Sequence, residues 1–360
     1  MLLKRWLLSA SSALLLFSVH TQGFEISPQG KLHLDYATQR EDRTNLDDDF
    51  QIRRARVGVK GGHGDWRFKL DYEFTDDGDF KDAYLGYEGF QAGNVTVGQF
   101  KVPFGLEQQI SSDDISFIER SLATEALVLS RRTGIGFSRA DKRYSASVMA
   151  FGPEIDKNNG YGAAVRATFA PLLEKNQRLL HIGVAAATEY TKGSTSLGTP
   201  PESRPGSTQL VDTDSIDGVD RIDRLGLEAA WQRGPVSAQA EWIHAGLRRD
   251  SGQPDVDVDG WYLSGSWFIT GETRPYEKGM FKSVEPKRDS GAWELVTRYS
   301  DVDLNDRNIE GGSEHNLTLG VNWYISSDLR LMLDYTDVHS RRQGESDDPE
   351  ILTMRAQISF

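Results

Sequence analysis

Basic side chains recur at alternate positions near the start of the chain. In residues 51–60, Arg54, Arg56 and Lys60 share one parity, and apolar residues occupy the other. Successive side chains of a β-strand point to opposite faces, so this segment predicts one cationic face and one apolar face. Guanidinium groups bind phosphate in a fork and stay charged at any relevant pH, which suits anion binding. Arg53 falls among the alternate positions that are otherwise apolar. It is therefore expected either at the end of the strand or at an interface, where its charged group can reach water.

A second basic pair, Arg67 and Lys69, lies on the polar face of the next alternating segment, residues 66–74. The two segments predict neighbouring strands that present a column of cations. Asp71 and Glu73 share that face, so an ordinary lining of mixed charge stays an alternative interpretation.

Motifs for other chemistry are missing from the sequence. It contains no Gly-x-Ser-x-Gly or His-Glu-x-x-His motif and no cysteine. Residues 255–260 begin like a calcium loop, but Ser266 stands where the bidentate glutamate belongs. No catalytic residue, metal or cofactor is therefore predicted, although a Ser/His/Asp site assembled only in space stays open.

Alternation of apolar and polar residues continues along most of the chain beyond residue 30. The polar parity is charged along nearly every segment, the apolar parity carries Trp, Tyr and Leu, and short turns alternate with long ones. This combination favours a membrane barrel over a soluble sandwich. The predicted fold is all-β, a transmembrane antiparallel β-barrel of about 16 strands that is wide enough to hold water.

Two connections are unusual for such a barrel. Residues 104–132 contain many apolar side chains, including Phe117, Leu122 and Leu127, which a loop surrounded by water would not carry. They are predicted to fold into the barrel and narrow it, with a short helix over the rim as the alternative. Residues 270–288 fall where the alternation requires a short turn, so they too are predicted to lie inside.

The sequence has 41 Lys+Arg against 54 Asp+Glu, a net charge of −13, and lacks an apolar run long enough for a membrane-spanning helix. An acidic total argues against nucleic acid as a partner. Residues 1–23 have the layout of a secretory signal peptide, with Lys4 and Arg5 before an apolar stretch. Residues 24–360 are predicted to form one barrel domain.

A series of short motifs begins within the basic column and continues along the chain. They occupy residues 53–56, 81–87, 98–107, 117–121, 291–295 and 320–324. Together they resemble the phosphate-selective porin O/P family of Gram-negative outer membranes, over most of the predicted mature chain. The last alternating segment, which ends at Phe360, also resembles the closing strand of bacterial outer-membrane barrels.

The resemblance implies a trimeric barrel in outer-membrane lipid, in which arginines and lysines draw inorganic phosphate or other small anions through a narrow constriction. It implies cations at Arg53, Arg54 and Arg120, hydroxyl donors at Ser111 or Ser112, and a tuning carboxylate at Asp82. With the basic column, the predicted substrate-binding residues are Arg53, Arg54, Arg56, Lys60, Asp82, Ser111, Ser112 and Arg120.

One departure from the family bears on the solute. The family's phosphate site draws on a lysine of the inward loop, but residues 105–130 contain no lysine, and Asp113 and Asp114 follow Ser112. This departure weakens the expectation for phosphate relative to other anions. The predicted function is passive diffusion of anions, phosphate or polyphosphate first, through an arginine-lined channel. A weakly selective porin for other small solutes and, less favoured, an outer-membrane barrel enzyme stay open.

Overall fold

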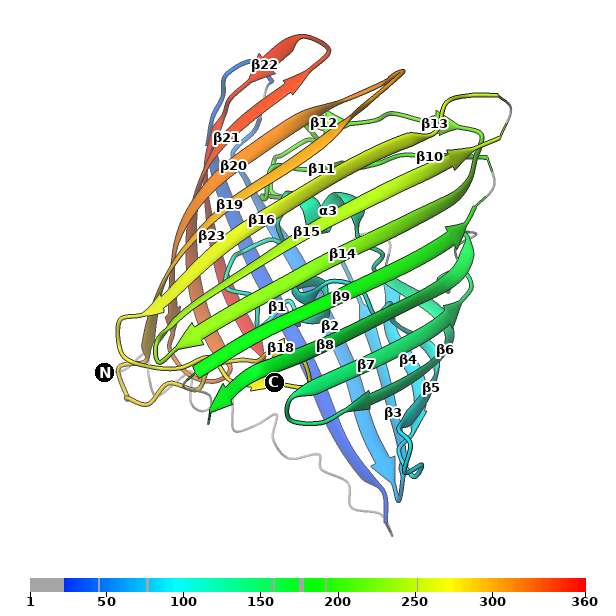
Figure 1. Cartoon of the computed structure of the whole chain (residues 1–360). Helices are drawn as coiled ribbons and strands as arrows, with labels where there is room; N and C mark the ends of the chain where they lie inside the picture. The colour runs from blue at the N-terminus through cyan, green and yellow to red at the C-terminus, as the bar shows by residue number, and fades with distance from the viewer. Residues whose placement is uncertain are drawn as a thin grey trace.

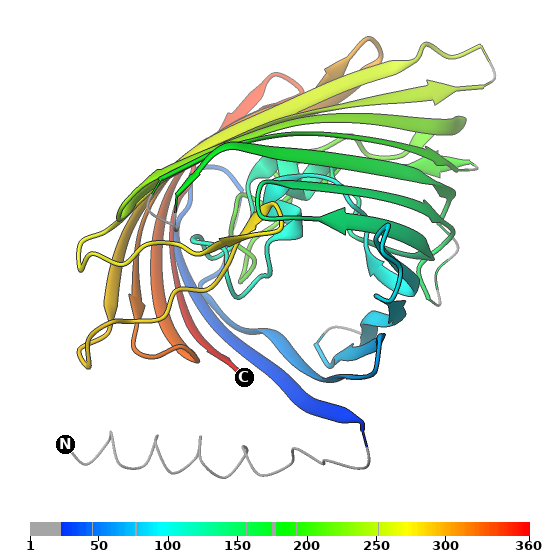
Figure 2. The same cartoon turned by 60° about the horizontal axis from the view of Figure 1, so that its bottom comes forward.

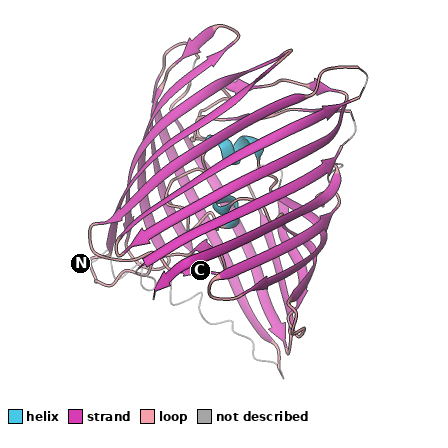
Figure 3. Cartoon of the chain, in the orientation of Figure 1, coloured by secondary structure: helices cyan, strands magenta, loops and turns pink. Residues whose placement is uncertain are grey.

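A computed structural model of the chain describes residues 23–44, 46–75, 78–155, 157, 159–174, 178–191, 193–250 and 252–360. The predicted signal peptide lies outside these residues except for Gly23. Long strands dominate the described part (Figures 1 and 3). They are β1 (Glu25–Arg40), β2 (Asp49–His63), β3 (Trp66–Glu73), β4 (Asp79–Tyr87), β5 (Asn94–Lys101), β6 (Arg131–Ala140), β7 (Tyr144–Phe151), β8 (Tyr161–Glu174), β9 (Arg178–Tyr190), β14 (Val219–Arg233), β15 (Val236–Arg249), β16 (Val256–Phe268), β19 (Ala292–Asp306), β20 (Ile309–Tyr324), β21 (Leu329–Arg342) and β23 (Glu350–Ser359).

These strands form one antiparallel sheet that closes on itself. Each pairs with the next long strand along the chain, and β1 pairs with both β2 and the last strand, β23. The short β22 (Glu345–Asp347) pairs with the end of β21 and is not one of the sixteen strands of the wall. Closure pairs peptide groups around the whole cylinder, which hydrocarbon requires. The predicted antiparallel barrel of sixteen strands is therefore confirmed. In the described part of the chain, no helix is both long and apolar enough to cross a membrane.

The two faces of the wall differ as the alternation predicted. On β14, Leu225 and Leu227 are exposed outward, whereas Arg224 and Glu228 are buried inside. Aromatic side chains stack on the outside, as in the pair Trp293–Trp323 with ring centroids 5.2 Å apart. An outer belt of exposed apolar and aromatic side chains is typical of a wall that meets lipid.

The connection between β5 and β6 folds into the barrel (Figure 2). We call residues 102–130 the inward loop; it contains α2 (Leu106–Gln109) and α3 (Leu122–Leu127). Ser121 caps α3 by accepting a hydrogen bond from the Thr124 backbone N–H. Leu122 and Leu127 are buried against apolar side chains on the inner faces of β15, β16 and β19. The predicted inward fold of this loop is confirmed.

Two further segments enter the barrel. Residues 269–291 hold the hairpin β17 (Tyr276–Glu277) and β18 (Met280–Phe281), and Arg166 of the wall donates to the Gly279 carbonyl at 2.9 Å. Their predicted inward position is confirmed. Residues 193–218 form the second segment, and many of their side chains are buried. They contain β10 (Ser194–Thr195), β11 (Gly198–Thr199), β12 (Val211–Asp212) and β13 (Ile216–Asp217).

Candidate functional site

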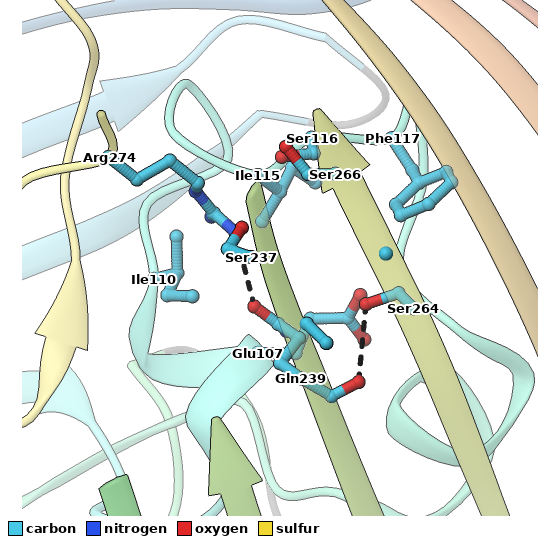
Figure 4. A pocket seen from close by; sticks show the side chains of 12 residues that line it. Glu107, Ile110, Ile115, Ser116, Phe117, Ser237, Gln239, Ser264, Ser266 and Arg274 are labelled. Carbon is cyan, nitrogen blue, oxygen red and sulfur yellow. Dashed lines mark hydrogen bonds between the residues drawn. The ribbon is translucent and has the colours of Figure 1, made fainter. Parts of the chain in front are cut away.

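The two sides of the inward loop differ in the space that they leave. A cavity of about 430 Å³ separates the loop from the inner faces of β1 to β6. On the other side the loop presses against β15 and β16. Only about 10 Å³ is left there, among side chains that include Glu107, Ser237 and Ser264 (Figure 4). A solute that crosses the barrel would therefore pass through the larger cavity.

The larger cavity is strongly cationic. Ten basic side chains line it, against the three carboxylates of Glu73, Asp82 and Glu125. The bases come from six neighbouring wall strands, the inward loop and the segment 269–291. They are Lys31, Arg53, Arg54, Arg56, Lys69, Lys81, Lys101, Arg120, Arg131 and Lys282.

A β-bulge turns two consecutive arginines of β2 inward. Opposite β1, the register shifts between His33 and Leu34, which leaves Arg53 as the extra residue. Arg53 binds Glu119 through contacts of 2.8 and 3.1 Å, and Arg54 lies 3.6 Å from the same carboxylate. The alternation predicted that Arg53 lies at a strand end or at an interface. This prediction is wrong, because the bulge interrupts the alternation.

Several other predicted residues also meet at the cavity. Arg56 pairs with Glu73 at 3.1 Å. Asp82 bridges two wall strands, with Lys69 Nζ at 2.9 Å and Arg131 Nε at 2.7 Å. A carboxylate between two cations both holds them in place and lowers the local positive charge.

The two serines of the predicted set lie at the tip of the inward loop. Ser112 accepts a hydrogen bond from Lys31 Nζ at 3.2 Å. Ser111 donates to Asp113 at 3.1 Å and also lines the cavity. Lys60 does not line the cavity. It is exposed and lies towards the end of β2.

Arg120 lines the cavity and also supports the loop. Its Nε donates to the Glu107 carbonyl at 3.3 Å and its Nη2 to the Ile110 carbonyl at 3.1 Å. Lys101 donates to the carbonyls of Gln108 and Ile110 at 2.7 and 2.9 Å. Arg120 and Lys101 therefore both fix the turn after α2.

Five of the lining bases belong neither to the basic column nor to the predicted substrate-binding residues: Lys31, Lys81, Lys101, Arg131 and Lys282. Together with Lys69, the lysines among them supply ammonium groups that the inward loop lacks. A weak signal existed for two of them, because Lys101 and Arg131 directly flank the apolar loop. Among the described residues, no group of three or more His, Asp or Glu side chains could hold a metal ion.

Comparison with known proteins points to the same kind of molecule as the structure does. Residues 26–360 match the family described as phosphate-selective porin O and P. The chain belongs to this family. Porin O of Pseudomonas aeruginosa is 29% identical to it over 395 residues, which cover 94% of this chain and 89% of that protein. An uncharacterized protein of Caulobacter vibrioides is 30% identical over 329 residues, covering 82% of this chain and 65% of that protein.

Solved structures with this fold are outer-membrane barrels of lower sequence identity. OmpT of Vibrio cholerae, an outer membrane protein solved with its loop L8 deleted, has a TM-score of 0.65 and 14% identity, covering 94% of this chain and 100% of that chain. An anion-selective porin from Comamonas acidovorans has a TM-score of 0.61 and 15% identity, with coverage of 94% and 100%. These likenesses concern the fold. As a member of its family, the porin lies in the Gram-negative outer membrane.

Cations lower the pKa of two carboxyl groups in the porin's inward loop. Burial by itself would raise the pKa of the Glu119 carboxyl, but Arg53, Arg54 and Arg355 together outweigh it and hold that pKa well below its usual range. Burial would also raise the pKa of Asp113, but the hydrogen bond from His33 and the charge of Lys31 hold it well below its usual range. Both carboxylates are thus charged wherever the porin works.

The lowered pKa values predict how the loop responds to acid. A carboxyl whose pKa is depressed by folding stabilises the fold above its unfolded pKa of ~4 and loses that contribution as the pH falls through the folded pKa. Asp114 of the same loop differs, because burial and the charge of Asp113 raise its pKa. In the Asp114→Asn porin we therefore expect single-channel conductance in planar bilayers to stay constant from pH 7 down to about pH 4, and to change only below it. An opening transition near pH 6 would contradict this expectation.

Proposed function

We propose that this porin is a passive channel for small anions, with inorganic phosphate or polyphosphate as the preferred solute, and that it is not an enzyme. The excess of ten bases over three carboxylates around the 430 Å³ cavity carries this proposal. Two unit charges ~6 Å apart at an effective dielectric of ~20 interact by roughly 3 kcal/mol. Several cations of that strength in series attract an anion without trapping it, as conduction requires.

The ion pairs of the cavity bases favour the passage of an anion over its retention in the cavity. Seven of the ten lining bases form ion pairs with carboxylates of the described residues, for example Arg56 with Glu73 and Arg131 with Asp82. Such pairs hold the basic side chains in position and reduce the net attraction. Arg120 and Lys282 form no such pair in the described part of the chain, and they add positive charge that no ion pair offsets.

Arg54 gives the direct test. In planar bilayers under a KCl gradient, we expect the unmodified porin to show an anion-selective reversal potential and phosphate to block the chloride current. Arg54→Ala should lower the anion-to-cation permeability ratio about fivefold, because one charge beside the passage is lost. Lys60→Ala, on the same strand but outside the cavity lining, is the matched control and should change the ratio little.

Two other results would redirect the proposal. Cation selectivity of the unmodified porin would contradict it. Esterase or protease activity in the same preparation would instead favour an enzyme. Family membership also leads us to propose a homotrimer, which chemical crosslinking of the detergent-solubilised porin would test.

A further inference from the structure

Asp113 of the inward loop lies where two cavities meet. A second cavity of about 120 Å³ shares Lys31, Arg56 and Ser111 with the 430 Å³ cavity, and Asp113 lines it. The Asp113 side chain is 17% exposed, whereas Glu119, the other anchoring carboxylate of the loop, is only 2% exposed. Asp113 can therefore meet a solute that moves from one cavity to the next.

The carboxylate of Asp113 is held by the kinds of donor that bind a small oxyanion. Lys31 Nζ forms an ion pair with Oδ2, and Ser111 Oγ donates to the same oxygen at 3.1 Å. His33 Nε2 lies 2.9 Å from Oδ1. Ammonium, hydroxyl and imidazole N–H groups are all donors to anionic oxygens, and charge-assisted bonds are the stronger ones.

Asp113 is also linked to one of the cavity arginines. Arg54 Nη1 lies 3.2 Å from His33 Nδ1. A guanidinium can only donate, so His33 Nδ1 accepts and its Nε2 carries the proton that is donated to Asp113. One carboxylate therefore binds Lys31 directly and Arg54 through His33.

Only the Asp113 side chain needs to move to free these donors. Gln357 of the wall donates to the Asp113 carbonyl at 3.1 Å, and the Asp114 backbone N–H donates to the Ser111 carbonyl at 2.9 Å. These bonds fix the backbone of the turn. A rotation of the carboxylate about its side-chain bonds would leave that backbone in place.

We propose that Asp113 is a built-in competitor for the anion subsite at Lys31 and sets how tightly the channel holds a permeating oxyanion. This inference rests on the proposed anion channel. An entering anion displaces the carboxylate from Lys31 and Ser111, and the carboxylate returns as the anion leaves. Binding that is opposed in this way stays weak, which keeps exit fast.

The test compares two adjacent carboxylates. The half-blocking concentration of inorganic phosphate on the chloride current is measured for Asp113→Asn and for Asp114→Asn. Both substitutions remove one negative charge from the same turn, but Asp114 forms no ion pair with a described residue. We expect Asp113→Asn to lower the half-blocking concentration about tenfold and Asp114→Asn to lower it by less than about twofold.

A second porin variant tests whether the effect of Asp113→Asn acts through Lys31. In a Lys31→Met porin, the shift caused by Asp113→Asn should disappear, because the subsite has lost the cation for which the carboxylate competes. Asp113→Ser replaces Asp113→Asn if the latter does not assemble. Equal shifts for the two asparagine variants, or none for Asp113→Asn, in an anion-selective wild type would overturn this inference alone. A cation-selective wild type would instead overturn the proposed function.

Discussion

Replacing Lys282 with glutamate is expected to remove most of the anion preference of the channel. Lys282 reaches the 430 Å³ cavity from the segment 269–291 and has no carboxylate within ion-pair distance among the described residues. No ion pair therefore neutralises its charge, although Asp114 of the inward loop interacts with it electrostatically, and the reversal changes the local charge by two units. Even after screening by water, we expect the anion-to-cation permeability ratio to fall about tenfold or more.

Reversal potentials in a KCl gradient measure this effect, and Lys278→Glu is the matched control. Lys278 lies on the same segment and undergoes the same charge change, but it is exposed and does not line the cavity. Its substitution should leave the ratio nearly unchanged. Similar shifts for both variants would mean that the charge of the whole segment 269–291 sets the selectivity. No shift for Lys282→Glu would mean that ions take another path.

The barrel could be predicted from sequence because its signal is local. On β14 each inward Arg or Glu is followed by an outward apolar residue, and such a period of two needs no knowledge of distant contacts. The alternation is less regular over residues 236–247, and the structure gives the reason. There the inner face changes along the strand: Ser237, Gln239 and Glu241 are polar, whereas Ile243, Ala245 and Leu247 are apolar and pack around α3.

The site was only partly predictable because its side chains are brought together by contacts between distant residues. Arg56 and Asp82 could be placed from parity and from motifs. The bulge at Arg53 depends on the register with β1, and the arrival of Lys282 depends on the path of an irregular segment. Lys31 and Asp113 are 82 positions apart, so neither residue's neighbours in the sequence indicate their ion pair.

Replacing Glu119 with glutamine is expected to be strongly destabilising. The carboxylate is 2% exposed and is shared by three guanidinium groups: Arg53 at 2.8 Å, Arg355 at 2.8 Å and Arg54 at 3.6 Å. The neutral amide keeps the shape but leaves buried cations without their counter-charge, which costs about 3–5 kcal/mol in the free energy of unfolding. Denaturant unfolding of the porin in detergent measures the change.

The same substitution should alter the channel, because the residues around Glu119 fix the inward loop. Arg298 donates to the Glu119 carbonyl at 3.0 Å, and the loop carries this anchor into the middle of the barrel. Once the arginines repel one another, the loop moves and single-channel conductance should rise. Glu125→Gln is the control for stability: Glu125 lies on the same loop, its ion pair among the described residues is with Arg204, and both side chains are partly exposed. Its loss should cost less than about 1 kcal/mol, because partly exposed pairs contribute little. Equal costs for both substitutions would mean that Glu119 does not anchor the loop.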